Sequence, residues 1–510
     1  MGEARPPGRD IADAPAARFV TGSTLRHVVV MGATGSVGLM AIFVVDLLSL
    51  LYIARLGDPV LTAAVGFATI VQIFAVSINI GMMIAVGALV SRALGGGDVA
   101  LARRLAASSL VLAVVASGLV TALMLPLLTP FLTLIGAGPE TVPAARTFLW
   151  IALPSSLLMA LGMGFSGVLR AVGDARRGMN VTLAGAAVTV LLDPLLIFGL
   201  NLGIEGAAIT IVIARLAFAW VGYAGAVRVH RMVARPTLAA VLADAGPILR
   251  VALPTVLTNL APPVASAFLA HVMAGFGTAT VAGNAVVDRV VPVAFGGLFA
   301  LSGAVGPILG QNWGAGRFDR MRATLRDAAL VTGLYVAAVW LALVFARGPL
   351  TALFGLSGAG ADLLAFFCLA GGAIWFFNGL LFLGNASFNN LGFPLAASAL
   401  NWGRATLGTM PTAWLGAHLA GQRGRWPGWG SGRRCSGWWG WRWRSGRWGC
   451  WSGGRSRIPG GVSAPGSWNG CRRVSGSAGS ERIAPLRACL SRISTQYLRQ
   501  TGSSYPLTSS

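Results

Sequence analysis

The 510-residue chain contains no lysine, only four histidines and five cysteines, and charged residues make up just 11% of it. Soluble domains carry about 25% charged residues, so this composition excludes a soluble globular protein. The cysteines show no spacing typical of a metal site, and the few histidines leave no clustered set for an intramembrane enzyme. We therefore expect no enzymatic activity, no metal centre and no bound cofactor.

Hydrophobic residues, by contrast, make up 55% of the sequence. Nearly uncharged runs such as 105–136 and 178–200 exceed the ~20 residues that a helix needs to cross a bilayer. The pattern predicts an all-α, polytopic membrane protein. We expect eleven spans, at about 28–54, 60–91, 102–129, 145–170, 178–199, 206–228, 247–274, 280–310, 323–346, 361–388 and 394–416.

Arginines are concentrated in alternate connections between these spans. They lie in the N-terminal leader, residues 1–27, and around 92–104, 170–177, 228–250 and 317–326. The positive-inside rule places such segments in the cytoplasm. We therefore expect a multi-pass protein with a cytoplasmic N-terminus.

The two halves of the chain carry the same order of apolar runs and the same glycine spacing. Gly97 precedes Gly173 by 76 residues, and Gly316 precedes Gly392 by the same 76 residues. A fixed spacing of this kind indicates an internal duplication.

The duplication predicts two lobes, 28–230 with six spans and 247–417 with five, joined by a cytoplasmic linker at 231–246. Because the first lobe has an even number of spans, both lobes enter the membrane in the same orientation. The repeats are then parallel and related by an axis along the membrane normal, with a solute-binding cleft between them at mid-depth.

The sequence changes character after residue 417. Residues 422–510 contain nine of the 16 tryptophans and 15 arginines, but a single acid, Glu481. We interpret 418–510 as a disordered, out-of-frame tail that replaces a twelfth helix. The alternative is an Arg/Trp-rich segment that binds anionic lipid or nucleic acid.

Two acids lie inside predicted spans of the first lobe, Asp46 in "FVVDLLSLLYIARLG" and Asp193 in "VTVLLDPLLIFG". A charged side chain at mid-bilayer costs roughly 2.5–3.5 kcal/mol on insertion scales, so it requires a role. Such a carboxylate can load and release a proton or bind sodium. We predict that both couple an ion gradient to transport. The alternative for Asp193 is a structural role at a kink, because Pro194 follows it.

Three polar residues are predicted to complete this cation site. Thr189 lies one helical turn before Asp193, Asn180 lies earlier on the same span, and Thr210 lies on the next span. For each of them, hydrogen bonding between helices is the alternative role.

The predicted substrate cavity takes polar and methionine side chains. Gln72 and Asn79 are seven residues apart, so they share a helix face, and Met159 and Met163 offer soft apolar contacts. Asn259, on the seventh span, is the fifth candidate. Two embedded arginines are interpreted as snorkelling or structurally paired residues. These are Arg215 and Arg404.

Five segments resemble landmarks of the multidrug and toxic compound extrusion (MATE) family, in the order that the family shows. They are "VVDLLSLLYIARLGDPVLTAAVG", "ALVSRALGGGDVALARR", "LRAVGDARRGMN", "LLDPLLIFGLNLGIEGAA" and "PILGQNWGAGRFDRMR", and the similarity runs over about 28–417. The resemblance implies twelve helices in two six-helix lobes that open as a V. It also implies export driven by inward flow of protons or sodium across a bacterial inner membrane.

The resemblance bears on individual residues. Asp46 matches the first-helix acid, and Asp193 the fifth-helix acid, that prokaryotic members use for cation coupling. Thr189 stands where an Asn is usual, and Thr210 corresponds to a sixth-helix Thr of the site. The acidic seventh-helix site of another branch has no counterpart in 247–274, which favours coupling in the first lobe.

These observations predict a cation-coupled antiporter that exports small organic cations or amphipathic drugs, working as a monomer in the bilayer without a nucleic-acid partner. One alternative is a flippase for lipid-linked sugars, which would require several cavity arginines to meet pyrophosphate. The other is a transporter inactivated by the loss of its twelfth helix.

Overall fold

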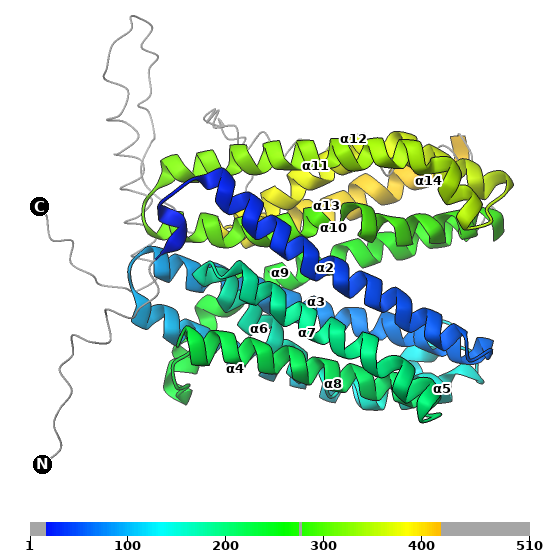
Figure 1. The fold of residues 1–510 in the computed structure, drawn as a ribbon, viewed down its shortest axis with the longest axis horizontal. Coiled ribbons are helices and arrows are strands. Elements are labelled where there is room, and N and C mark those ends of the chain that lie inside the picture. The colour runs from blue at the N-terminus through cyan, green and yellow to red at the C-terminus, as the bar shows by residue number, and fades with distance from the viewer. Residues whose placement is uncertain (1–16, 275–277, 420–510) are drawn as a thin grey trace, which may run out of the picture. The chain divides into compact units, whose positions relative to one another are not determined.

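The computed structural model describes residues 17–274 and 278–419, and every regular element in this part of the chain is a helix (Figure 1). Within it, nine helices are long and apolar enough to cross a membrane, or ten if one bent pair counts as a span. The segment after residue 417, where a twelfth helix is predicted to be replaced by a disordered tail, lies almost entirely outside the described residues.

The first half of the chain forms six spans, some of which are interrupted. Its elements are η1 (Arg18–Val20), α2 (Thr24–Ala54), α3 (Pro59–Gly95), α4 (Val99–Leu134), α5 (Thr141–Ala152), α6 (Ser156–Val172), α7 (Ala175–Pro194), η2 (Leu195–Gly199), α8 (Gly203–Tyr223) and η3 (Ala224–Val229). α5 and α6 are one span bent by 49°, and α7 and α8 continue into the π-helical η2 and η3.

The second half provides four helices that are long and apolar enough to cross a membrane, and its last predicted span, 394–416, is divided among three shorter helical elements. Its elements are α9 (Leu238–Ala274), α10 (Thr278–Gly314), α11 (Phe318–Leu353), α12 (Gly358–Leu391), α13 (Pro394–Gly403), η4 (Arg404–Thr409) and α14 (Met410–Leu419). α9 begins at Leu238, so part of the predicted linker at 231–246 is helical. Thr237 accepts a hydrogen bond from the Ala240 amide at 3.3 Å and starts the helix, which then continues through Pro247.

Glycines with positive φ recur 219 residues apart and mark the same turns in both halves. The pairs are Gly97 and Gly316, Gly136 and Gly355, and Gly173 and Gly392. Gly173 and Gly392 both end a helix in the left-handed conformation, which other residues adopt only with strain. The repeat predicted from the sequence is therefore present in the backbone.

Each half also has a hydrophobic core of its own. Phe148, 2% exposed, packs with residues of α2 to α5 and α8, whereas Phe367, fully buried, packs with residues of α9 to α12. These two phenylalanines are again 219 residues apart.

α3 and α10 cross near their C-terminal ends, at glycines related by the same repeat. A Cβ on Gly95 would lie 2.0 Å from the Gln311 carbonyl oxygen, and a Cβ on Gly314 would lie 2.1 Å from the Arg92 carbonyl oxygen. Gly95 and Gly314 are equivalent positions, and so are Arg92 and Gln311, so the contact is reciprocal about a pseudo-twofold axis. Because C-terminal ends meet, the two repeats run in the same direction.

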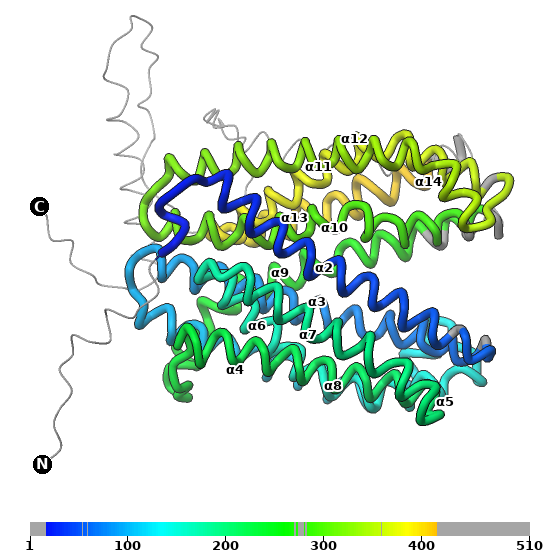
Figure 2. Tube along the Cα trace, in the orientation of Figure 1, coloured from blue at the N-terminus to red at the C-terminus, as the bar shows by residue number. Residues whose placement is uncertain are grey.

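The first helix of each repeat packs across onto the other repeat. Thr24 of α2 donates a hydrogen bond to Asp327 of α11 at 2.5 Å, and Ser108 of α4 donates to Asp244 of α9 at 2.8 Å. Figure 1 shows α2 running beside α7 of its own repeat and α10 of the other, and both contacts are extensive. The tube in Figure 2 follows the same path along the Cα trace.

The end of the predicted leader is ordered and packs against the second repeat. Phe19 is 2% exposed, and its amide donates to Gln311 Oε1 at 2.8 Å. Arg320 donates to the carbonyl oxygens of Phe19 and Thr21 at 2.9 and 3.0 Å. The leader predicted for 1–27 therefore includes residues that belong to the folded body.

Asp174 holds the turn between α6 and α7. Its carboxylate accepts hydrogen bonds from the Arg177 amide at 3.0 Å, from the Arg177 guanidinium at 2.5 Å and from His230 Nε2 at 2.8 Å. Burial alone would raise the pKa of Asp174, but these hydrogen bonds together hold its pKa below the ordinary value. The carboxylate thus ties the end of η3 to the start of α7.

We expect Asp174→Ala to lower the free energy of unfolding by roughly 2–3 kcal/mol, because it removes a helix cap and charged hydrogen bonds. The folded pKa lies below the unfolded value of about 3.9, so the carboxylate's contribution is fully present above that pH. It is lost as the pH falls through the lower, folded pKa. Thermal unfolding of the purified protein measures both effects, and equal melting temperatures for the two proteins would contradict the assignment.

Candidate functional site

Asp193 lies at the end of α7 and is buried, with 2% of its surface exposed. Ser49 of α2 donates a hydrogen bond to Asp193 Oδ2, and the Thr210 side chain of α8 lies beside this carboxylate, while its hydroxyl donates to the Gly206 carbonyl oxygen of its own helix at 3.0 Å. Three spans therefore meet at one carboxylate. A proton or a small cation bound there would be surrounded by oxygen atoms from α2, α7 and α8.

The local sequence explains why the helix changes at this point. Pro194 lacks an amide hydrogen, and beyond it the chain continues as the π-helical η2. Asp193 accepts a hydrogen bond from Ser49 of α2, and Thr210 of α8 lies beside it, so its partners are on neighbouring helices. The carboxylate thus links helices and does not cap the kink.

Asp46 is exposed, and no hydrogen bond or ion pair joins it to another described residue. The exposed residues Val37, Val44 and Leu51 mark the outward apolar stripe of α2. At about 100° per residue, Asp46 lies roughly 140–180° from these three residues, about 100° from exposed Leu47 and about 60° from Ser49. Its side chain therefore leaves α2 on the side away from the stripe, which is also the side of Ser49.

The other predicted cation ligands lie at different distances from Asp193. Thr210 contacts it, as described above. The Thr189 hydroxyl, one turn away, donates to Gly185 of its own helix at 3.1 Å. Asn180 is exposed and thirteen residues from Asp193, about 20 Å along α7. Asn180 is therefore too far away to bind the same ion, because helical rise separates residues that the sequence places on one span.

Two predicted cavity residues of α3 face the break between α5 and α6. Asn79 is 1% exposed, and its amide donates to the Ser156 carbonyl oxygen at 3.5 Å. Gln72 Oε1 accepts a hydrogen bond from Arg215 of α8 at 2.7 Å. Both side chains thus point into the first repeat.

The remaining cavity candidates are divided between the repeats. Met159 and Met163 are half-buried on α6. Asn259 is half-buried on α9 and donates to the Thr255 carbonyl oxygen at 2.8 Å. The structure therefore groups Gln72, Asn79 and the methionines in the first repeat and leaves Asn259 on the second.

Polar side chains fill the break between α5 and α6. A broken helix leaves carbonyl groups without helical partners, and at bilayer depth these need donors from elsewhere. Arg215 donates to the Ala152 carbonyl oxygen at 2.8 Å and to Ser155 Oγ at 2.9 Å. Thr121 of α4 donates to the Leu153 carbonyl oxygen at 3.4 Å.

The second repeat has a comparable arginine. Arg404, at the start of η4, is 7% exposed and donates to Asn378 Oδ1 at 2.8 Å. Neither Arg404 nor Arg215 forms an ion pair with a described residue. Both arginines therefore have structural hydrogen-bond partners, as predicted, but neither has an acidic partner that neutralises its charge.

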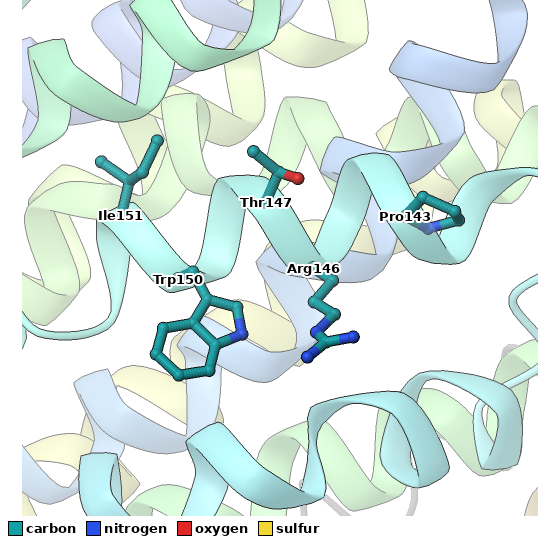
Figure 3. A pocket seen from close by; sticks show the side chains of 5 residues that line it. All are labelled: Pro143, Arg146, Thr147, Trp150 and Ile151. Atoms are coloured by element: carbon teal, nitrogen blue, oxygen red, sulfur yellow. The ribbon is translucent and has the colours of Figure 1, made fainter.

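A surface hollow runs along α5 (Figure 3). Its lining side chains all come from this helix. They are Pro143, Arg146, Thr147, Trp150 and Ile151. No predicted cavity residue is among them, so this hollow is distinct from the predicted substrate site.

Sequence reasoning did not identify Ser49. It lies three residues after Asp46 on α2 and hydrogen-bonds Asp193. The signal that could have found it is this spacing, because positions three apart share a helix face.

The chain has two parallel repeats of membrane-spanning helices, and a buried carboxylate links the first helix to its own repeat. These features define a secondary transporter and not an enzyme. The MatE family model matches residues 36–195 and 254–415, one segment in each repeat. The chain belongs to this family, the MATE efflux transporters.

Several known proteins are similar to the chain. A protein named FAD transporter, from Shewanella oneidensis, is 27% identical over 405 residues, which cover 77% of this chain and 88% of that protein. The multidrug export protein MepA of Staphylococcus aureus is 22% identical over 68% of this chain and 77% of its own. The crystal structure of a variant of the Vibrio cholerae MATE transporter VcmN has a TM-score of 0.78 at 25% identity, covering 83% of this chain and 96% of its own.

Proposed function

We propose that the chain is an ion-coupled antiporter of the bacterial inner membrane that exports amphipathic organic compounds. Asp193 and Asp46 are its coupling acids, and the coupling ion is a proton or sodium. The observation that carries this proposal is the meeting of α2, α7 and α8 at the buried carboxylate of Asp193. Relatives named as multidrug exporters support the direction of transport, and the relative named FAD transporter extends the candidate cargo to phosphorylated compounds.

Ion binding at Asp193 would act on the contact between α2 and α7. An ionised carboxylate only accepts hydrogen bonds, whereas a protonated one also donates, and a bound cation draws on its oxygen atoms. Either change alters the Ser49 hydrogen bond. Since α2 also packs on α10 and α11, a shift of α2 reaches the interface between the repeats. An ion drives such a change only through different affinities for the two conformations.

The positive-inside rule supports a cytoplasmic position for the arginine-rich end of the bundle. The crossing of Gly95 and Gly314 lies at this end: the Arg92 carbonyl oxygen is part of it, and Arg320 donates to Asn312, two residues before Gly314. In this conformation the crossing closes the cytoplasmic side, and export requires it to open in alternation with the other side.

Asp46→Asn tests the proposal directly. We expect ion-driven export of ethidium from proteoliposomes to fall by at least about tenfold, because an amide cannot exchange a proton or hold a cation by charge. Imposing a pH gradient and a sodium gradient separately shows which ion is coupled.

Asp58→Asn is the matched control for this experiment. Asp58 is an exposed N-cap of α3, and an asparagine caps a helix equally well. The control should export at the wild-type rate. Export by the Asp46 variant that equals the wild type under both gradients would rule out Asp46 as a coupling acid.

A further inference from the structure

Arg215 is a charged side chain inside the first repeat with no acidic partner among the described residues. Its guanidinium donates to Gln72 Oε1 at 2.7 Å, to the Ala152 carbonyl oxygen at 2.8 Å and to Ser155 Oγ at 2.9 Å. All three acceptors are neutral. They satisfy hydrogen-bonding donors of Arg215 but leave its positive charge without compensation.

An uncompensated charge in this position is costly. Buried charges in proteins are normally paired, and charged residues within membrane spans usually serve substrate or ion pathways. Hydrogen bonding to the helix break alone does not require a charge, because a neutral amide side chain can donate to a carbonyl group as well. An anion that is not part of the described chain would compensate this charge.

The helix geometry places Arg215 in the interior of the first repeat. Exposed Ile213, Leu216 and Trp220 mark the outward stripe of α8, and at about 100° per residue Arg215 lies roughly 100–160° from each of them. Thr210, beside Asp193, precedes it by five residues, which is about 7.5 Å along the axis and about 140° around it, so Arg215 faces the break between α5 and α6 and not the ion site.

The surroundings suit one end of an amphipathic molecule. Arg215 is half-buried, so its remaining donors are not fully enclosed, and the half-buried Met159 lies one turn beyond Ser155. A guanidinium presents five donors in a planar fork, and the three hydrogen bonds of Arg215 use only some of them. Such a fork matches the oxygen spacing of a phosphate group better than an ammonium does.

We propose that Arg215 binds a phosphate group of the exported molecule, so that the cargo of this chain includes phosphorylated amphiphiles as well as, or in place of, organic cations. This inference rests on the proposed export function and assigns its substrate class. Gln72 positions the guanidinium, and the break between α5 and α6 supplies the carbonyl group that holds it.

FAD and riboflavin share the fluorescent ring, and riboflavin lacks the two phosphates and the adenosine of FAD. We expect the purified full-length protein to bind FAD about tenfold more tightly than riboflavin. A difference of this size corresponds to one charge-assisted hydrogen bond. FMN differs from riboflavin by one phosphate alone and should show the same preference over riboflavin, which separates the phosphate from the adenosine. Arg215→Gln should remove this preference and change riboflavin affinity less than about twofold.

Arg404→Gln is the matched control, since it removes a buried arginine that is also bound to an amide but lies in the other repeat. It should leave the preference for FAD unchanged. Arg215→Lys keeps the charge but not the fork, so it should retain part of the preference, and it carries the test if the glutamine variant fails to fold.

Equal loss of FAD and riboflavin binding in Arg215→Gln would show a purely structural role and overturn the inference. So would a wild-type protein that does not distinguish the two flavins. The measurement needs no ion gradient, so its outcome is independent of the Asp46 transport experiment, which tests the export function.

Discussion

Gly95→Leu should nearly abolish transport while leaving the protein folded in the membrane. The Cβ alone would lie 2.0 Å from the Gln311 carbonyl oxygen, a backbone atom that cannot move without separating α3 from α10. Overpacking typically costs about 1–3 kcal/mol, which corresponds to a roughly 5- to 150-fold shift away from the closed crossing. An alternating-access carrier that cannot close one side cannot complete its transport cycle.

Thiol labelling can follow the closed crossing directly. Ser91 is buried beside Gly310 in this contact, so Ser91→Cys, in a background without the five native cysteines, reports when the crossing opens. Labelling of the Ser91→Cys protein should be slow when Gly95 is present and fast when Gly95→Leu is added. Gly66→Leu, at an exposed site on α3 with nothing within 4 Å, is the matched control. If Gly95→Leu neither changes labelling nor slows transport, the crossing is not a gate.

Asp193→Asn should uncouple transport from the ion gradient. The amide keeps the size of the side chain and can still accept from Ser49, but it cannot load a proton or bind a cation by charge. We expect export against a concentration gradient to stop, since the ion then contributes no energy. Movement down a concentration gradient should persist, because the helices and their packing are retained.

Ser49→Ala separates the two roles of this site. It removes one hydrogen bond to the carboxylate, worth about 1–3 kcal/mol for a charged partner, but leaves the acid in place. Coupled export should persist with a shifted ion-concentration dependence of roughly 5- to 150-fold. Concentrative export by Asp193→Asn at the wild-type level would exclude Asp193 from coupling.

Much of the fold could be predicted from the sequence because membrane spans depend on length and apolarity. Ten of the eleven expected spans are long and apolar enough to cross a membrane when the bent α5–α6 pair counts as one, and the last, 394–416, is helical but divided among α13, η4 and α14. The 219-residue repeat relates backbone turns as well as glycine spacing. Boundaries were less predictable. The seventh span was expected from residue 247, but the helix begins earlier at Leu238, since Thr237 caps it and Pro247 is accommodated within α9.

Contacts within the site were only partly predictable. Local spacing placed Thr189 one turn before Asp193, and the family resemblance pointed to Thr210 on the next span. Neither could show that Ser49, 144 residues away, donates to the same carboxylate. Arg215 was interpreted as snorkelling or structurally paired because a sequence does not reveal whether a buried charge has a neutralising partner. That information depends on which helices become neighbours.

The packing of α2 against the second repeat has a consequence for how the protein is synthesised and inserted into the membrane. Thr24 meets Asp327, 303 residues later in the chain. At the usual 5–20 residues per second of synthesis, the first helix waits roughly 15–60 s in the bilayer before this partner exists. During that interval Asp46 sits in a nascent chain whose second repeat has yet to emerge from the ribosome. Early insertion of this helix should therefore be the step that depends most on the translocon, or on an insertase that keeps Asp46 away from lipid until the second repeat is made.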